Sequence, residues 1–337
     1  MNTNKKEQKF IVVIGASAGG LNALAELVGQ LQPGMGAAYF VVMHLSRKGI
    51  GNFLTHRLQQ HTSMTCRVPV NGEPILEDHI YIANPNQHML LDEKHIVIGH
   101  GPQENRWRPS IDVLFRSAAV AHNSHVIGII LTGLLDDGTS GMWAIGQCGG
   151  ASIVQDPNEA EYPDMPLAVL NNMEVDYCVS LGEMGALLQR ITSGRHIPPH
   201  QVPEEIKAEA EISYKVVTSI DAVSQLGEHS IFACPDCGGG LWHIANNNMT
   251  KYRCHIGHSY SEKDLMVKQT DKIESTLWVA LRMMEERKRL LQKLQNDASQ
   301  KGFTKMSAGH KETAEEIEQH IDLLKKLLYG VQETDHN

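Results

Sequence analysis

Short apolar runs alternate with longer mixed segments over the first 193 residues of the chain. Six of the runs predict strands, at residues 10–14, 39–43, 79–83, 95–98, 126–131 and 151–155. Several of them are continuously apolar, which is typical of parallel strands that are covered on both faces. Five segments between them predict helices, at residues 21–31, 51–60, 111–122, 139–146 and 165–172. This alternation predicts a doubly wound α/β domain with a mostly parallel sheet over residues 1–193.

The pattern changes after this domain. Residues 194–213 contain three prolines followed by Glu, Lys and Ala, and we interpret them as a linker. Residues 214–268 hold a cluster of Cys and His, which we interpret as a small separate module. In residues 269–337, apolar residues recur every three or four positions from Ile273 to Leu294 and again from Ala314 to Leu328, with a break at 302–309. This spacing predicts two amphipathic helices that form a hairpin.

Composition narrows the class of protein. The chain has 337 residues, a formal net charge of -9 and no dense block of Lys or Arg, so nucleic acid is not an expected partner. Aromatic residues are 5% of the chain, so the core must be mostly aliphatic. A polar N-terminus leads into an apolar run that is too short for a signal peptide or a membrane span, and we expect a cytoplasmic protein.

The first candidate for chemistry is Ser17, within the segment Gly-Ala-Ser-Ala-Gly-Gly at 15–20. Small residues on both sides permit a tight turn from strand to helix, which can lift a serine hydroxyl above the sheet edge as a nucleophile. The next helix offers unpaired backbone N–H groups that suit an oxyanion. The alternatives are a phosphate-binding loop or a simple turn, although the segment lacks the dinucleotide fingerprint.

A serine nucleophile needs a base and an orienting carboxylate. His44 follows the second predicted strand, and Asp136 and Asp137 follow the strand at 126–131. The carboxyl ends of parallel strands meet at one edge of a sheet, so these groups can converge with Ser17. The alternatives are a His44 that only hydrogen-bonds to the backbone, and an aspartate that only caps the next helix. The order Ser, His, Asp differs from that of ordinary α/β-hydrolases.

Five ordered segments resemble the catalytic domain of the CheB-type chemotaxis methylesterases: IGASAGG at 14–20, VVMH at 41–44, YIANPNQHM at 81–89, NRWRPSIDVLF at 105–115 and ILTGLLDDGTSG at 130–141. The resemblance implies Ser17 as nucleophile, His44 as general base and Asp137 as the orienting acid. It also implies that His88 and Met165 lie near the site without a role in the triad. The N–H groups of Ala18 and Leu134 are the expected donors to the oxyanion.

The resemblance implies a carboxylic ester hydrolase that cleaves glutamate γ-methyl esters on chemoreceptors, and that can also deamidate glutamine. It implies no cofactor for catalysis. Regulated members carry a receiver domain ahead of the catalytic domain, and we expect a stand-alone form without it, because the first strand begins near Phe10. Leu135 replaces a glycine of the family, and a leucine would be strained if that position has a positive φ.

The later Cys/His segment has the spacing of a zinc ribbon. Cys234 and Cys237 precede three glycines, and Cys254 and His258 follow after a 16-residue gap. These four residues predict a closed structural zinc site, with His255 and His243 as substitute ligands. The alternatives are a redox Cys-x-x-Cys or a knuckle without metal. The segment resembles a C-terminal extension of some stand-alone CheB-type proteins.

Two functions compete with the methylesterase hypothesis. One is a non-catalytic, CheB-like scaffold of a signalling pathway, and the other is an esterase for a different small ester. The expected partners are a methylated chemoreceptor or a similar helical protein, which would bring the chain to the membrane only through the receptor. A dimer through the C-terminal helices is a further hypothesis.

Overall fold

The computed structural model describes residues 9–44, 51–194, 198, 200–215, 219–246 and 249–334. The chain forms two compact units, Met1–Leu265 and Met266–Asn337. The Cys/His segment belongs to the first unit, together with the α/β domain.

The centre of the first unit is a seven-stranded parallel sheet in the order β10-β9-β8-β1-β2-β5-β3. Its strands are β1 (Phe10–Ala16), β2 (Ala37–Met43), β3 (Thr65–Arg67), β5 (His79–Ile82), β8 (Val126–Ile130), β9 (Ala151–Gln155) and β10 (Tyr177–Val179). Every residue of β1 and β8 is buried, as their apolar runs predict. The predicted doubly wound, parallel α/β class is confirmed.

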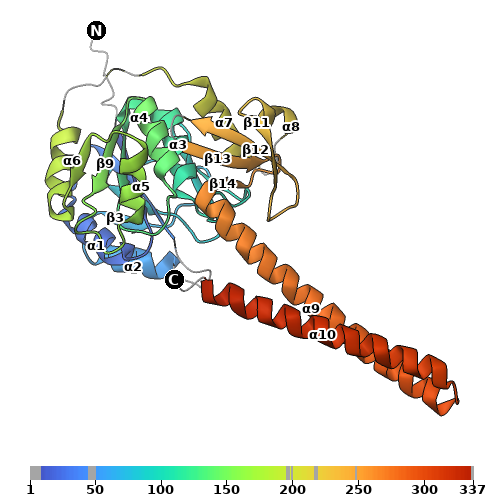
Figure 1. Ribbon diagram of the computed structural model, residues 1–337. Coiled ribbons are helices and arrows are strands. Elements are labelled where there is room, and N and C mark those ends of the chain that lie inside the picture. Colours follow the sequence, from blue (N-terminus) through green and yellow to red (C-terminus); the bar gives the residue numbers. More distant parts are fainter. Residues whose placement is uncertain are drawn as a thin grey trace, which may run out of the picture. The chain divides into compact units, whose positions relative to one another are not determined.

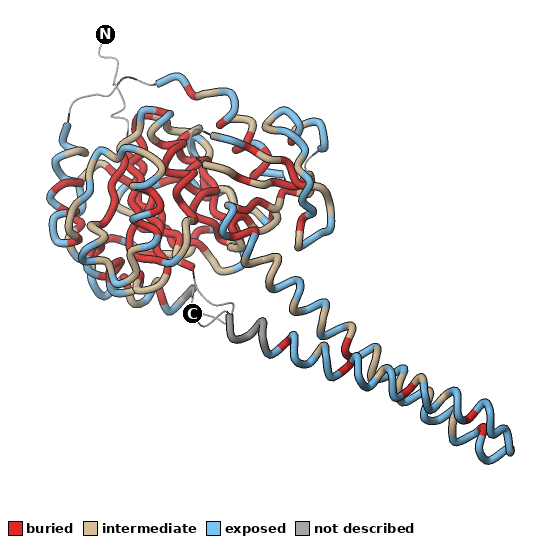
Figure 2. Tube along the Cα trace, viewed as in Figure 1, coloured by how far each residue is buried: buried red, intermediate tan, exposed pale blue. Residues whose placement is uncertain are grey.

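Helices cover both faces of this sheet (Figure 1). One face carries α1 (Gly20–Gln30), α2 (Gly51–Gln59) and α6 (Met184–Thr192), and the other carries α3 (Ile111–His122), α4 (Thr139–Gln147) and α5 (Asp164–Asn172). Two 3-10 turns, η1 (Asn123–His125) and η2 (Leu181–Glu183), precede β8 and α6. The two aliphatic cores that result are the buried centre of the unit (Figure 2).

Two predictions from apolar pattern were wrong in detail. The strand predicted at 95–98 is β7 (His95–Gly99), which is not part of the parallel sheet but pairs antiparallel with β4 (Glu73–Pro74) and β6 (His88–Leu91). Its pattern predicts a strand but contains no information about its partners. The apolar neighbours of Cys178 in the sequence predict a buried thiol, but the residue is exposed, because it lies on the short edge strand β10.

A packed helix occupies the second half of the segment that we interpreted as a linker. This helix, α7 (Glu204–Tyr214), packs against α3 and buries Ile206, Glu209, Ala210 and Ser213. These positions follow the three/four spacing of one helix face. The prolines and the charged residues suggested a linker. One of those charged residues, Glu209, is buried, and the sequence does not reveal this because its ion-pair partners lie far away along the chain.

The Cys/His segment folds as a four-stranded antiparallel sheet after the short helix α8 (Ile220–Ser224). Its strands, in spatial order, are β11 (Glu228–Ala233), β12 (Gly240–Asn246), β13 (Met249–Cys254) and β14 (Ser259–Ser261). We call this sheet with its two Cys/His loops the ribbon. Leu241, Tyr260 and Leu265 form its small core with two of the cysteines.

The second unit is the predicted helical hairpin. It consists of α9 (Glu262–Gln300), whose first four residues lie in the first unit, and α10 (Thr304–Thr334). Leu281, Ile321 and Leu328 form a buried apolar core between its helices. The loop is shorter than the break predicted at 302–309, because α10 begins at Thr304 and includes Gly309. Among the described residues, no helix is long and apolar enough to span a membrane.

Candidate active site

Ser17, His44 and Asp137 follow three adjacent strands of the sheet. Ser17 comes directly after β1, His44 directly after β2, and Asp137 lies in the loop after β8, which flanks β1 on its other side. The register pairs Ala16 with Met43, so Ser17 and His44 lie across from one another. Backbone hydrogen bonds hold both turns, from Ser17 N to Thr132 O at 3.0 Å and from His44 N to Ala16 O at 3.1 Å.

The His44 imidazole makes a buried hydrogen bond with Asp137. The distance between Nε2 of His44 and Oδ2 of Asp137 is 2.8 Å, and the two side chains are 1% and 3% exposed. An ionised Asp137 has no proton to donate and can only accept this hydrogen bond, so the proton of a neutral His44 lies on Nε2. The other nitrogen, Nδ1, is buried and has no hydrogen-bond partner within the part of the chain that the structure describes. Its lone pair is therefore available to accept a proton. Among the described residues, no hydrogen bond of the Ser17 hydroxyl is found, to Nδ1 or elsewhere.

The N-terminus of α3 holds the Asp137 carboxylate. Oδ2 accepts a second hydrogen bond from the Ile111 N–H at 2.7 Å, and Oδ1 accepts from Ser110 Oγ and from Asn105 Nδ2, both at 2.9 Å. Burial raises the pKa of Asp137, but the bonds from His44, Ile111 and Asn105 outweigh it, so the pKa lies below its usual value. Asp137 thus stays ionised although it is buried.

The neighbouring Asp136 points elsewhere. Its Oδ1 accepts a hydrogen bond from Ser261 Oγ of the ribbon at 3.0 Å. Asp137, and not Asp136, is therefore the carboxylate that contacts His44, which the two adjacent aspartates in the sequence left open.

Two backbone N–H groups near Ser17 have no acceptor. Among the described residues, neither Ala18 N nor Leu134 N donates a hydrogen bond. The two segments are close, because Thr132 Oγ1 donates to Ala18 O at 3.1 Å. Gly133 permits this approach, since a Cβ atom there would lie 2.7 Å from Ser17 Cβ and 2.1 Å from Met165 Sδ.

His88 and Met165 both lie close to these residues and are buried. His88 Nε2 donates to Pro102 O at 2.8 Å, and its Nδ1 accepts from the Ser110 N–H at 3.3 Å, so both nitrogens are used. Burial lowers the pKa of His88, which fits a neutral ring that links two loops. Met165 packs on Gly133, and its N–H donates to Gly133 O at 3.0 Å.

Leu135 has a φ of 66°, in the left-handed region that favours glycine. The strain that we expected for a leucine at this position is therefore present in the loop that carries Asp137.

A family model described as "CheB methylesterase" matches residues 12–188, which include Ser17, His44 and Asp137. The chain belongs to the CheB methylesterase family.

Similar proteins share the same region. Proteins named protein-glutamate methylesterase/protein-glutamine glutaminase, from Rhizobium johnstonii and Salmonella typhimurium, are 34% and 33% identical over 183 and 192 residues, or 53% and 56% of this chain. The chain matches only about half of their length, 50% and 54%. A Leptospira interrogans protein with the same two activities in its name is 34% identical over 181 residues, 53% of this chain and 93% of that protein.

The fold is similar to that of the solved CheB methylesterase catalytic domain of Thermotoga maritima. The TM-score is 0.52 with 28% sequence identity, over 54% of this chain and 98% of that domain. The similarity to these proteins covers the α/β domain of this CheB family member.

Two residues of the site were not predicted. Trp107 stacks on His44 with ring centroids 4.1 Å apart and an angle of 7° between the planes. The Asn105 amide donates from Nδ2 to Asp137 at 2.9 Å and to Asp112 at 2.7 Å. Both lie in the segment 105–115 that carries the family resemblance, and that was the only available signal for them.

The four predicted metal ligands converge in the ribbon of this CheB family member. The ligand atoms of Cys234, Cys237, Cys254 and His258 all lie within 4.8 Å of one another. Cys237 and Cys254 Sγ are 3.7 Å apart, and His258 Nδ1 is 3.7 Å from Cys234 Sγ and 3.5 Å from Cys254 Sγ. A tetrahedral zinc with ordinary Zn–S and Zn–N bonds requires separations of about 3.5–3.8 Å. The cluster therefore has the donor types and spacing to hold a metal ion.

The substitute ligands lie outside this cluster. His255 contacts Trp242 edge-on, and His243 lies against Tyr252. No disulfide links the two cysteines of the Cys-x-x-Cys pair.

Proposed function

We propose that this protein is a serine carboxylic ester hydrolase that acts as a protein-glutamate methylesterase, with glutamine deamidation as a related reaction. The observation that carries the proposal is the buried His44, which directly follows the strand that pairs with the strand before Ser17. Its Nε2 is hydrogen-bonded to Asp137, and its Nδ1 has no hydrogen-bond partner among the described residues. A nucleophile, a base and an orienting acid are the parts that acyl transfer requires.

The proposed reaction begins when His44 Nδ1 removes the Ser17 hydroxyl proton and Oγ attacks the ester carbonyl. The N–H groups of Ala18 and Leu134 bind the oxyanion, and each such donor contributes about 10²–10³ in turnover. His44 then protonates the departing methoxide, which leaves as methanol. Water attacks the acyl-enzyme with His44 again as base, and releases the glutamate carboxylate and the Ser17 hydroxyl. None of these steps needs a cofactor.

The test is methanol release from a methylated chemoreceptor, measured for the wild type and for Ser17→Ala. We expect release by the wild type and none above background for the variant. His88→Gln, outside the triad, is the matched control for damage near the site. Equal release by wild type and Ser17→Ala would favour the scaffold reading, and turnover of small esters without action on receptors would favour a different substrate.

We propose that the hairpin binds a helical partner, and that this partner is the chemoreceptor. Four exposed apolar residues of α9, Val279, Met283, Leu290 and Leu294, are separated by 4, 7 and 4 positions and so form one stripe along the helix. Leu281 and the other residues that pack on α10 lie on the opposite face. Exposed apolar stripes of this kind mark interaction surfaces.

The variant Met283→Glu/Leu290→Glu tests this surface in the full chain, because neither side chain is buried in the hairpin. We expect weaker receptor binding in a co-sedimentation assay with unchanged hydrolysis of a small ester. Glu286→Lys/Lys293→Glu, which changes charge but not the apolar stripe, is the control. Unchanged receptor binding together with loss of a dimer would identify a second copy of the chain as the partner.

We propose that the ribbon holds a structural Zn²⁺ through Cys234, Cys237, Cys254 and His258. The four positions are filled by protein ligands, so no open position for catalysis remains. Metal analysis of the purified protein should give one zinc per chain, and His258→Ala but not His255→Ala should lose it. We also propose a cytoplasmic location, because none of the six cysteines forms a disulfide.

A further inference from the structure

The ribbon contacts the loop that carries Asn105 and Trp107 at three places. Gly257 packs on Pro102, so closely that a Cβ atom at position 257 would lie 3.2 Å from Cγ of the proline. The Arg253 guanidinium binds both carboxylate oxygens of Glu104, at 3.1 and 2.7 Å. The Ser259 carbonyl accepts the N–H of Asn105 at 2.8 Å.

The loop is a tight turn from Glu104 to Trp107, closed by two backbone hydrogen bonds of 3.2 and 3.0 Å between these residues. Its central residues, Asn105 and Arg106, both have positive φ, at 49° and 68°. Two successive positive φ angles are typical of a type I′ turn, in which Asn, Asp and Gly are usual, so Asn105 suits its position and Arg106 is strained. Such strain persists only where surrounding contacts stabilise it, and here the ribbon supplies those contacts.

The turn delivers one contact to each of two members of the triad. Asn105 donates to Asp137, and Trp107 stacks on His44. A shift of the turn would therefore move the acid and the base together.

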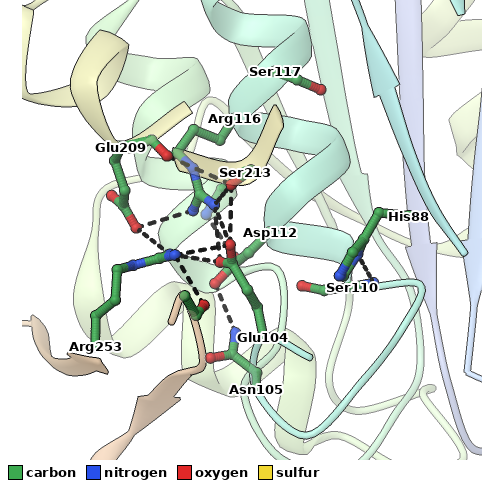
Figure 3. Close-up of polar contacts among 12 residues, drawn as sticks. His88, Glu104, Asn105, Ser110, Asp112, Arg116, Ser117, Glu209, Ser213 and Arg253 are labelled. Atoms are coloured by element: carbon green, nitrogen blue, oxygen red, sulfur yellow. Dashed lines mark hydrogen bonds and ion pairs between the residues drawn. The ribbon is translucent and has the colours of Figure 1, made fainter. Parts of the chain in front are cut away.

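A buried network of charges fixes the ribbon to the turn (Figure 3). Arg253 of β13 and Arg116 of α3 both bind Glu104 and Glu209, with distances of 2.7–3.2 Å. The two arginines are 0% and 1% exposed. Lys251 adds ion pairs to Glu209 at 3.3 Å and to Asp112 at 3.5 Å. Because removal of one partner leaves an uncompensated buried charge, these contacts oppose undocking of the ribbon strongly.

The residues that grip the turn are direct neighbours of the candidate metal ligands. Arg253 precedes Cys254, and Ser259 follows His258. The loop between the two ligands is closed by hydrogen bonds from Cys254 N to His258 O at 3.0 Å and from Gly257 N to Cys254 O at 2.9 Å. Arg253 Nη1 also donates to the Gly257 carbonyl of this loop at 3.3 Å. The geometry of the Cys/His loop therefore determines where the guanidinium and the Ser259 carbonyl lie.

We infer that the ribbon is a positioning module for the catalytic triad, in which Arg253 and Ser259 hold the Glu104–Trp107 turn that orients Asp137 and His44. Ordering of the Cys/His loop by a metal ion sets this grip, so metal content controls the rate of the ester hydrolysis at Ser17. The inference rests on the proposed esterase function, and assigns Arg253 as a positioning residue that never touches substrate.

Arg253→Met tests the inference in the full chain. We expect kcat to fall on the order of 10- to 100-fold with KM nearly unchanged, because the triad but not the substrate surface is displaced. Arg253→Lys should recover only part of the loss, since an ammonium cannot bind the carboxylate in two places. Ile231→Ser, at an exposed site on β11, is the control within the ribbon.

Glu104→Gln guards against simple unfolding, because it keeps the size of the side chain. Glu104→Gln should also lower kcat. In the Glu104→Gln background, Arg253→Met should lower kcat by a smaller factor than it does alone, as expected for residues that act through one contact. Additive effects would overturn the assignment. So would a wild-type kcat in an Arg253→Met protein whose circular dichroism and melting curve show it folded.

A second experiment reads the turn without any substrate. Zinc is removed with a chelator and restored with Zn²⁺, and amide hydrogen exchange is followed over residues 101–112. We expect faster exchange there on removal and recovery on restoration, with a matching loss and return of the downfield proton resonance of the His44–Asp137 hydrogen bond. Unchanged exchange and an unchanged resonance in the metal-free protein would overturn the role of the metal.

Labelling of Ser17 by a fluorophosphonate separates this inference from the proposed substrate. If the wild type labels but releases no methanol from receptors, the substrate proposal fails, and the labelling rates of the Arg253 variants still test the positioning role. If the wild type releases methanol and folded Arg253→Met labels as fast as the wild type, the inference fails and the proposed function stands.

Discussion

The indole ring of Trp107 lies parallel to the imidazole of His44, with 4.1 Å between the ring centroids. This contact covers one face of the imidazole and limits the rotation of the ring about its hydrogen bond to Asp137. The base of the proposed triad is thus positioned by a carboxylate at its edge and by an aromatic ring at its face.

Replacement of Trp107 should therefore reduce turnover more than binding. For Trp107→Leu we expect kcat to fall about 10-fold with a small change in KM, because the imidazole gains freedom to leave the reactive orientation. Trp107→Phe keeps a stacked ring and should lose less. Steady-state kinetics of methanol release checks this, and a change confined to KM would contradict the positioning role.

Asp137→Asn should be far more damaging than Asp136→Asn. An asparagine at 137 can donate to Nε2 of His44, which would place the ring proton on Nδ1 and remove the lone pair that the proposed mechanism uses to accept the Ser17 proton. A tautomer change of this kind costs about 10⁴ in turnover in serine hydrolases. Asp136 contacts Ser261 rather than His44, so its variant is the matched control. Equal losses for the two variants would mean that the acid is wrongly assigned.

Leu135→Gly should stabilise the protein. Leu135 has a φ of 66°, where a side chain costs about 1–2 kcal/mol in backbone strain, and glycine removes that cost. The neighbour Leu134, which is not among the residues with positive φ, is the control, and Leu134→Gly should be neutral or destabilising. Thermal and urea unfolding measure both variants. A lower melting temperature for Leu135→Gly would show that contacts of the leucine side chain outweigh the strain.

Asp264→Asn should change the pH dependence of stability. Burial raises the pKa of Asp264 to about 8, and the charges of Asp136 and Asp137 add to the rise. The carboxyl therefore binds its proton more tightly in the folded than in the unfolded chain. Its contribution to stability is complete below about pH 4 and is lost as the pH rises toward 8.

Asparagine at position 264 does not titrate. We therefore expect Asp264→Asn to raise the free energy of unfolding at pH 8 by about 1–3 kcal/mol and to have little effect near pH 4. Urea unfolding across this pH range is the measurement. Glu262→Gln is the control, because Glu262 is an exposed carboxylate at the start of the same helix. A difference between wild type and Asp264→Asn that does not grow with pH would contradict the raised pKa.

The sequence by itself determined the alternation of the main strands and helices in the α/β domain, but not the short strands β3, β4, β6 and β10 or the helix α6. Parallel strands buried on both faces must be continuously apolar, so the patterns of β1 and β8 follow from local composition alone. The strand-end positions of Ser17 and His44 were predictable for the same reason. The ligand spacing of the ribbon was readable because Cys-x-x-Cys places two thiols on one tight loop.

Only the tertiary structure decided which side chains meet. Asp136 and Asp137 are neighbours in the chain, and a turn of the backbone directs one to Ser261 and the other to His44. The network of Glu104, Arg116, Glu209 and Arg253 joins residues up to 149 positions apart. From the sequence alone, a charged residue is predicted to be exposed. It can be buried only when it has a partner of opposite charge, and here that partner lies in an element far away along the chain. For this reason the segment at 194–213 looked like a linker, and the link from the ribbon to the triad appeared only in the folded chain.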